Sequence, residues 1–330
     1  MSRFERFSMV AFVVICACLA FLLNAVLSPA SPLRVEAQLA EAQGVDLDVL
    51  LENNHDFIPG ESEGYTFEEY LNNLEYYKQE IYNTFKGSRE VVSFIYYDII
   101  TGYTFSYNED VEFPSASSIK ANLAIYIMDL VSQGRADLSK RLTYTEAFYN
   151  PGSGRIKDCP PGTEYTIDQL LERMMIDSDN VAYTMLLHEF GYKNVQQYWY
   201  DLNAETTYKR GAPWGSLSAR DGLIYMRRLY SFFREAGEYG EKLMGLFKRS
   251  NFRYVFSAAK DIEVAHKSGN TTASMNDLAI VFDDQPFILI VLTRKDAFDT
   301  SHMDFFSQAS MQVHAFHEYY WNNISYSYIQ

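Results

Sequence analysis

The spacing of hydrophobic positions changes several times along the chain, and each change predicts a different kind of element. In residues 66–85 apolar side chains recur every three to four positions, which predicts an amphipathic helix. Two short runs of β-branched and aromatic residues follow at 91–97 and 103–107, and they predict strands joined by a turn at 98–102. The first part of the pattern is therefore a helix followed by a β-hairpin.

The middle of the chain has helical spacing alone. An apolar run at residues 121–131 predicts a buried helix that begins near Ser117. The segment 166–169 has the sequence of a capping box at the start of a second helix. A third helix is predicted at 181–190, and residues 218–221 are typical of the start of a fourth.

The last part of the chain predicts three strands, at residues 264–268, 278–282 and 287–293, and a closing helix at about 301–320. The strands from both ends of the chain can join in one mostly antiparallel five-stranded sheet. Helices would flank this sheet, and an all-helical subdomain would be inserted between its two parts. We therefore expect an α+β fold, with a ligand-binding cleft between the sheet and the inserted subdomain.

An apolar stretch near the N-terminus has the length of a membrane span. It lies within residues 8–28 and follows two arginines, so we expect a transmembrane anchor with residues 1–7 in the cytoplasm and the remainder exported. A cleaved signal peptide, which would leave a secreted protein, is the alternative. Residues 29–65 have the composition of an acidic linker, which leaves residues 66–330 for the functional domain.

The charge of the chain narrows the range of partners. The formal net charge is −15, and residues 29–118 hold 17 acidic and 4 basic residues. An acidic surface repels phosphate groups, so nucleic acid and anionic membrane surfaces are not expected partners.

Cysteine and histidine usage predicts neither a disulfide framework nor a metal site. Cys16 and Cys18 lie in the apolar stretch, and Cys159 stands alone in the rest of the chain. No Cys/His set has zinc spacing, and His314 and His317 are expected to be surface or packing residues of the closing helix. We expect no metal and no cofactor.

Ser117 and Lys120 are the candidate catalytic pair. Residues three apart lie on the same face of a helix, so both side chains would point the same way from the first turn. A lysine whose pKa is lowered by burial can take the proton of a serine nucleophile. The alternative is a helix cap and a surface lysine. A second Ser-x-x-Lys, from Ser257 to Lys260, does not open an apolar helix.

A second motif, Ser178-Asp179-Asn180, lies between two predicted helices. The hydroxyl of Ser178 could relay a proton to a leaving nitrogen, and the amide of Asn180 could hold both a C=O and an N–H of a substrate. The alternative is a simple turn between the helices.

A third motif, His266-Lys267-Ser268-Gly269, lies on a predicted strand. Lys267 would place a positive charge near a substrate carboxylate, and Ser268 would donate a hydrogen bond to it. Gly269 would let the substrate approach the strand edge, although a plain strand end remains the alternative. His266 invites a serine–histidine mechanism, but alternation along the strand turns it away from the site.

In this order the three motifs resemble those of the penicillin-recognising serine hydrolases, specifically the class A β-lactamase-like branch. The resemblance extends over about residues 66–325 and implies a β-lactamase/transpeptidase-like fold. It implies acylation of Ser117 by a β-lactam or by the D-alanyl end of a cell-wall peptide. It also implies an oxyanion hole formed by the backbone N–H groups of Ser117 and Asn270.

The chain departs from that family in the step that releases the acyl group. Class A β-lactamases carry a water-activating glutamate in a Glu-x-x-Leu-Asn segment, and no such segment occurs here. Glu205 is the nearest candidate, but its neighbours do not match. The resemblance therefore predicts acylation followed by slow hydrolysis. A non-catalytic, membrane-anchored binding protein that retains the fold is the alternative function.

Overall fold

The computed structural model describes residues 67–208 and 214–322, which belong to one compact unit. The predicted cytoplasmic end, membrane anchor and acidic linker, residues 1–7, 8–28 and 29–65, lie outside these residues. Within the described ranges no helix combines the length and the apolar character needed to cross a bilayer.

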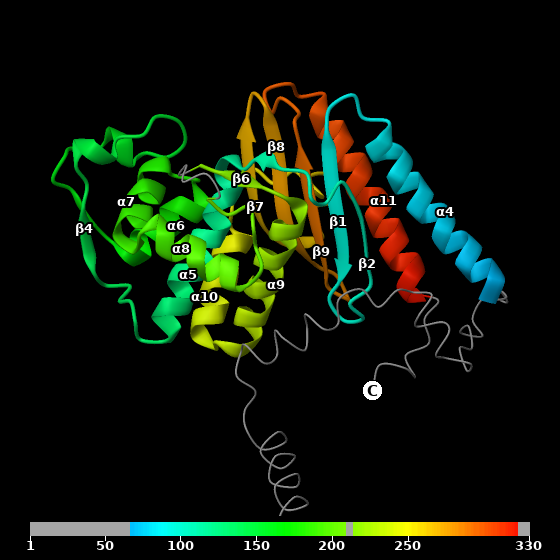
Figure 1. Ribbon diagram of the computed structural model, residues 1–330, viewed down its shortest axis with the longest axis horizontal. Coiled ribbons are helices and arrows are strands. Elements are labelled where there is room, and N and C mark those ends of the chain that lie inside the picture. The colour runs from blue at the N-terminus through cyan, green and yellow to red at the C-terminus, as the bar shows by residue number, and fades with distance from the viewer. Residues whose placement is uncertain (1–66, 209–213, 323–330) are drawn as a thin grey trace, which may run out of the picture. The chain divides into compact units, whose positions relative to one another are not determined.

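A five-stranded sheet forms the centre of this unit (Figure 1). Its order is β2-β1-β9-β8-β7, and every neighbouring pair is antiparallel. Strands from both ends of the sequence therefore meet in one sheet, as predicted. The bounds are β1 (Val92–Asp98), β2 (Thr104–Tyr107), β7 (Glu263–Thr271), β8 (Ser274–Phe282) and β9 (Phe287–Thr293).

Strands β7 and β8 are longer than the sequence pattern predicted, because they continue to a tight turn. The predicted strands at 264–268 and 278–282 cover only their apolar parts. The added residues include Gly269, Asn270 and Asn276. The alternation of apolar and polar positions does not identify these residues as part of a strand. Because β7 is an edge strand, its outer side remains available to neighbouring elements.

Helices cover both faces of the sheet. One face packs against α4 (Phe67–Lys86) and α11 (His302–Asn322), which lie side by side (Figure 1). The other face packs against α5 (Lys120–Ser132), α9 (Ala219–Glu235) and α10 (Glu238–Lys248). Two separate apolar clusters result, one on each side of the sheet.

Helix α5 is the buried helix that the apolar run predicted, and its residues from Lys120 to Val131 are all buried. Its start differs from the prediction. A 3₁₀ turn, η1 (Ala116–Ile119), precedes it, and Ala116 has a positive φ of 47°. Ser117 therefore lies on the 3₁₀ turn, and the α-helix begins at Lys120. An alanine in the left-handed region is strained, and such strain is common at functional turns.

The inserted subdomain consists of α5 together with α6 (Ile167–Ile176), α7 (Asn180–Phe190) and α8 (Tyr192–Asp201). The predicted caps are confirmed: Thr166 and Gln169 form a capping box, and Ser218 accepts a hydrogen bond from the backbone N–H of Asp221. The sequence did not predict α8, α10 or the short strands. The short strands are β3 (Phe113–Pro114), β4 (Arg141–Thr143), β5 (Glu164–Thr166) and β6 (Ser216–Leu217).

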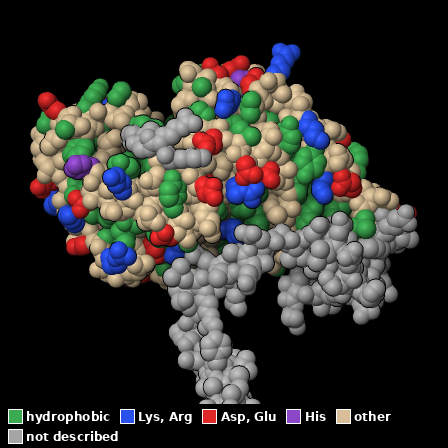
Figure 2. All heavy atoms as spheres, in the orientation of Figure 1, with side chains coloured by type: hydrophobic (Ala, Val, Ile, Leu, Met, Phe, Trp, Pro, Cys, Tyr) green, Lys and Arg blue, Asp and Glu red, His purple; other side chains and the backbone are tan. Residues whose placement is uncertain are grey.

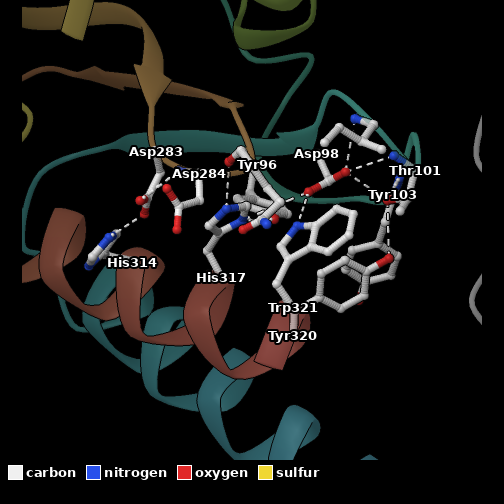
Figure 3. A network of polar contacts seen from close by, with 12 residues as sticks. Tyr96, Asp98, Thr101, Tyr103, Asp283, Asp284, His314, His317, Tyr320 and Trp321 are labelled. Carbon is white, nitrogen blue, oxygen red and sulfur yellow. Dashed lines mark hydrogen bonds and ion pairs between the residues drawn. The ribbon is translucent and has the colours of Figure 1, made fainter. Parts of the chain in front are cut away.

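The closing helix α11 is fastened to the sheet by a buried polar network (Figure 3). The hydroxyl of Tyr96 lies 2.7 Å from Nδ1 of His317, whose Nε2 lies 2.8 Å from the carbonyl of Gln285. The indole N–H of Trp321 donates to a carboxylate oxygen of Asp98 at 2.7 Å. His317 is thus a packing residue, which is one of the two roles predicted for it.

The face drawn in Figure 2 carries acidic and basic side chains next to one another. Among the ion pairs of the described residues, Arg220 lies 2.6 Å from Asp110.

Candidate active site

The turn that carries Ser117 is pressed against the edge strand. Gly269 of β7 is the point of closest approach, because a Cβ atom there would lie 2.5 Å from the backbone nitrogen of Ser118 and 2.8 Å from that of Ser117. No real side chain tolerates such distances, so only glycine permits this packing. The predicted reason for the glycine was room for a substrate, whereas the neighbour found at this position is the nucleophile turn.

Lys120 lies at the centre of the site. Its Nζ is 3.0 Å from Oγ of Ser117, 3.1 Å from Oγ of Ser178 and 2.8 Å from Oδ1 of Asn180. A fourth hydrogen bond, of 2.5 Å, goes to the carbonyl of Ser178. The candidate nucleophile, the candidate relay and the candidate substrate-holding amide therefore all meet at one amine.

Burial disfavours the charged form of this lysine. Lys120 has no exposed surface, and the loss of hydration lowers its pKa well below the usual range. The second cause is the positive charge of Lys267, while the carboxylate of Asp179 acts in the opposite direction. A lowered pKa favours the neutral amine, which is the form that can accept a proton from Ser117.

Ser178 lies between α6 and α7, and Asn180 is the first residue of α7. Ser178 has a φ of 55°, which aims its hydroxyl at Lys120. Between them, Asp179 caps α7 by accepting the N–H groups of Val181 and Ala182, both at 2.9 Å. The segment is therefore a rigid helix start rather than an unconstrained turn.

Lys267 lies on β7 in the layer between the sheet and the helical subdomain. Register places it opposite Leu278, which belongs to the apolar cluster on that side. Burial lowers its pKa to about 8, and Asp277 partly offsets this effect. Its Nζ donates to the carbonyl of Ser268 at 3.1 Å. A buried cation with a single protein acceptor in the described part of the chain fits a role in anion recognition.

Ser268 and His266 alternate with Lys267 and belong to the opposite face of the strand. His266 lies 2.9 Å from a carboxylate oxygen of Asp277 and 3.0 Å from the carbonyl of Ser250. Both of its ring nitrogens are occupied away from Ser117, as the alternation predicted. Register places Ser268 opposite Asp277.

Asn270 follows Gly269 directly and is exposed at the end of β7. The contact of Gly269 with the Ser117 turn brings the main chain of Asn270 to the same end of the site. The pair of backbone N–H groups implied by the resemblance, those of Ser117 and Asn270, thus belongs to two segments in direct contact.

The Beta-lactamase enzyme family matches residues 76–317 of the chain. The chain belongs to this family. A search among curated proteins found no match.

Solved structures of the family share the fold. PBP-A is 22% identical and has a TM-score of 0.68, with 75% of this chain and 97% of that chain covered. A β-lactamase from Sphaerobacter thermophilus DSM 20745 is 18% identical, with a TM-score of 0.65 and coverage of 73% and 97%. An ancestral class A β-lactamase is 20% identical, with a TM-score of 0.64 and coverage of 72% and 99%. The β-lactamase/transpeptidase-like fold that the motifs implied is confirmed.

This member of the β-lactamase family has no carboxylate bonded to its central lysine in residues 67–208 and 214–322. The side chain of Glu205 is exposed, and its backbone N–H donates to Asp221 at 3.1 Å. Both oxygens of Asp179 accept backbone N–H groups, including that of Arg155 at 2.7 Å. Residues 209–213 have the sequence Lys-Arg-Gly-Ala-Pro, which contains no acid.

The sequence patterns did not identify two residues that lie at the candidate site. The ring of Trp214 lies 5.3 Å from Nζ of Lys120. Asn276, on β8 opposite Gly269, donates to the carbonyl of Pro114 at 2.8 Å and accepts the N–H of Thr293 at 3.1 Å. The one available signal was composition: Trp214 is one of three tryptophans and lies in a loop, and Asn276 is a polar residue inside an apolar strand.

Within the described residues, no group of three or more histidine, cysteine, aspartate or glutamate side chains is placed to hold a metal ion.

Proposed function

We propose that this member of the β-lactamase family is an acylating serine hydrolase in which Ser117 attacks an amide or β-lactam carbonyl. The observation that supports this most directly is the position of Lys120. Its amine lies within 3.0 Å of the Ser117 hydroxyl and 3.1 Å of the Ser178 hydroxyl, and it is fully buried. One neutral amine can thus take a proton from the nucleophile and return it through Ser178.

The proposed reaction begins when Oγ of Ser117 bonds to the carbonyl carbon and its proton moves to Nζ of Lys120. The negative charge that develops on the carbonyl oxygen is stabilised by the backbone N–H groups of Ser117 and Asn270. The C–N bond then breaks, and the leaving nitrogen takes a proton from Ser178, which Lys120 replaces. The products are an ester on Ser117 and an amine, which stays attached to the ester when the substrate is a β-lactam ring.

Two groups would position the substrate. Asn180 already uses Oδ1 for Lys120 and Nδ2 for the carbonyl of Pro151, at 2.8 Å in each case. An amide oxygen has a second lone pair, so Oδ1 remains able to accept a substrate N–H, whereas Nδ2 would exchange its 3.5 Å contact with Oδ1 of Asn150 for a substrate C=O. Lys267 would attract the substrate carboxylate, whereas Ser268 belongs to the opposite face of the strand and is not placed beside it.

Two substrates fit this chemistry: β-lactams and the D-alanyl end of cell-wall peptides. The family, and a mutant of PBP-A determined as an acyl-enzyme complex with penicillin G, favour the first. The absence of a carboxylate on Lys120 within the described residues favours the second, because an ester at Ser117 would persist. We propose a D-alanyl peptidase-type enzyme that penicillins acylate and that releases them slowly.

We also propose that the enzyme acts outside the cytoplasm. Residues 8–28 would anchor it in the plasma membrane, or would be removed as a signal peptide. This location suits a cell-wall substrate.

The test is to incubate residues 29–330 with penicillin G and follow the intact mass. The chain supplies a matched control, because Ser117 and Ser257 both belong to Ser-x-x-Lys sequences. We expect a persistent adduct in the wild type and in Ser257→Ala, and none in Ser117→Ala. An adduct that survives Ser117→Ala would contradict the assignment of the nucleophile.

A chromogenic cephalosporin separates the two substrate classes. We expect slow turnover that depends on Ser117. Rapid Ser117-dependent hydrolysis would instead identify an efficient β-lactamase. If Ser117→Ala left the cellular phenotype unchanged and the wild type formed no adduct, the non-catalytic binding protein would be the better description.

A further inference from the structure

Two aromatic rings lie next to the amine of Lys120. Nζ lies 5.3 Å from the centre of the Trp214 ring and 6.0 Å from that of Tyr183. The two rings lie 4.7 Å apart and are inclined by 39°. Tyr183 is fully buried, whereas Trp214 is only partly buried. Trp214 is therefore the outer of the two rings and separates the lysine from solvent.

Trp214 is held in position by Ser115, which lies two residues before the proposed nucleophile Ser117. The hydroxyl of Ser115 donates to the carbonyl of Trp214, and the backbone N–H of Ser115 donates to the carbonyl of Gly215 at 3.4 Å. The short strand pair β3–β6 continues this contact, with Pro114 opposite Ser216. The ring over Lys120 and the turn with Ser117 are thus attached to the same piece of main chain.

Among the described residues other than Lys120 itself, the acid–base groups around its amine offer no free base for a hydrolytic water. The charged and titratable groups that face Lys120 are Asp179, which caps α7, Tyr183 on α7 and Lys267 on β7. Asp179 is occupied by backbone N–H groups, and burial raises the pKa of the Tyr183 hydroxyl so that it stays protonated. Access of water beside Lys120 is therefore the variable that can limit release of an acyl group.

We propose that Trp214 keeps water away from Lys120 and from the ester carbonyl of acyl-Ser117, and so sets the lifetime of the acyl-enzyme. This inference rests on the proposed acylation of Ser117. In the step that Trp214 restrains, the oxygen of water bonds to the acyl carbon and the ester bond to Oγ of Ser117 breaks. One water proton returns to Ser117, and the other stays on the carboxylic acid that leaves.

The ring has two opposing effects on the lysine, and their magnitudes decide the result. A ring face attracts an ammonium ion, which favours the charged form. Exclusion of water disfavours the charged form, and loss of hydration is the largest cause of the lowered pKa of Lys120. Removal of the ring should therefore raise the pKa of Lys120, because hydration returns.

The experiment compares Trp214→Ala and Trp214→Phe with the wild type, using penicillin G and residues 29–330. Excess penicillin is removed after acylation, and loss of the Ser117 adduct is followed by intact mass. We expect Trp214→Ala to lose the adduct roughly tenfold faster, and Trp214→Phe to stay close to the wild type. Phe298→Ala, which removes a 73% exposed ring, is the control and should leave the lifetime unchanged.

A second readout distinguishes water exclusion from a structural effect. The acid limb of the acylation rate against pH reports the pKa of the base, and we expect it to move to higher pH in Trp214→Ala. A loss of packing alone would lower the rate without moving this limb. If Trp214→Ala does not fold, as judged by circular dichroism, Trp214→Leu takes its place and should give an intermediate lifetime.

An unchanged adduct lifetime in the folded alanine or leucine variant would overturn the inference while leaving the proposed function intact. The same holds if only the preference for the acyl side chain changes, because Trp214 would then be a substrate-binding ring. If the wild type forms no adduct at all, both the proposed function and this inference are wrong.

Discussion

At the scale of single residues, the site depends on two lysines that are buried close enough to influence each other. Lys120 has no exposed surface and Lys267 only 1%. The charge of Lys267 helps to lower the pKa of Lys120, while Lys267 itself titrates at about 8. Burial therefore favours the neutral amine at Lys120, whereas Lys267, with a pKa of about 8, is mostly charged at neutral pH. A general base must be neutral to accept a proton, and a group that binds an anion must be positively charged.

The pKa of Lys267 predicts a limit on substrate binding at high pH. The group is positively charged below about pH 8 and neutral above it. We expect the KM for a substrate that carries a carboxylate to rise as the pH passes 8. In Lys267→Arg the charge persists, because guanidinium stays protonated, and the rise should disappear. Steady-state kinetics from pH 6 to 10 measure both. The same rise in the arginine variant would show that another group binds the carboxylate.

At the scale of elements, the site is set by the contact between the turn η1 and strand β7. Gly269 allows the two backbones to meet. On β8, the side chain of Asn276 donates a hydrogen bond to the carbonyl of Pro114 and accepts one from the backbone N–H of Thr293 on β9. The turn that carries the candidate nucleophile Ser117 is therefore positioned by packing against β7 and β8, and small changes in this packing should affect acylation more than stability.

Gly269→Ala tests this expectation. Its Cβ would lie 2.5 Å from a backbone nitrogen, so the turn must move away from β7. We expect acylation to fall about a hundredfold, as for a misplaced reacting group, and stability to fall by about 1–3 kcal/mol. Thermal unfolding and adduct formation measure the two effects.

Gly245 is the matched control for that change. It lies within α10, where an added Cβ meets nothing within 4 Å. Alanine is favoured over glycine inside a helix by about 1 kcal/mol. Gly245→Ala should therefore keep full acylation and unfold at a slightly higher temperature. Equal losses of acylation in both variants would contradict a specific role for the η1–β7 contact.

At the scale of the whole molecule, the closing helix holds the first strands of the sheet in place. His317 on α11 bonds to Tyr96 on β1 and to the loop before β9. Burial lowers the pKa of His317, mainly by loss of hydration, and Asp98 partly offsets this effect. The folded protein therefore binds a proton at His317 less readily than the unfolded chain does, in which a histidine titrates at about pH 6.5.

This difference predicts the sign of one pH effect on stability. Below about pH 6.5 the unfolded state binds more protons at this position, so the free energy of unfolding falls as the pH falls. His317→Gln removes the titration. We expect the gap in melting temperature between wild type and variant to shrink from pH 7.5 to pH 5.5. Calorimetry measures the two melting temperatures. A difference that stays constant with pH would mean that His317 has the same pKa in the folded and unfolded states.

The long strands and most of the helices followed from the chain's own periodicity, whereas α8, α10 and the short strands did not. The capping residues Thr166 and Ser218 and the five strands were all marked by local pattern. The three motifs pointed to Ser117, Lys120, Ser178 and Asn180, which meet as expected. These features depend on residues close together in sequence, which is why spacing reveals them.

Only the tertiary structure decided which parts meet across long sequence distances. Spacing along one strand cannot show that Gly269 packs against the turn of Ser117, or that Trp214 lies over Lys120. Nor did the apolar pattern indicate the 3₁₀ turn before α5, because the packing of β7 and the β3–β6 pair determines the start of that helix. The sequence by itself determined the elements and the reactive groups. The packing between distant elements decided the burial, the neighbours and the access of water, because these depend on how the surfaces fit together.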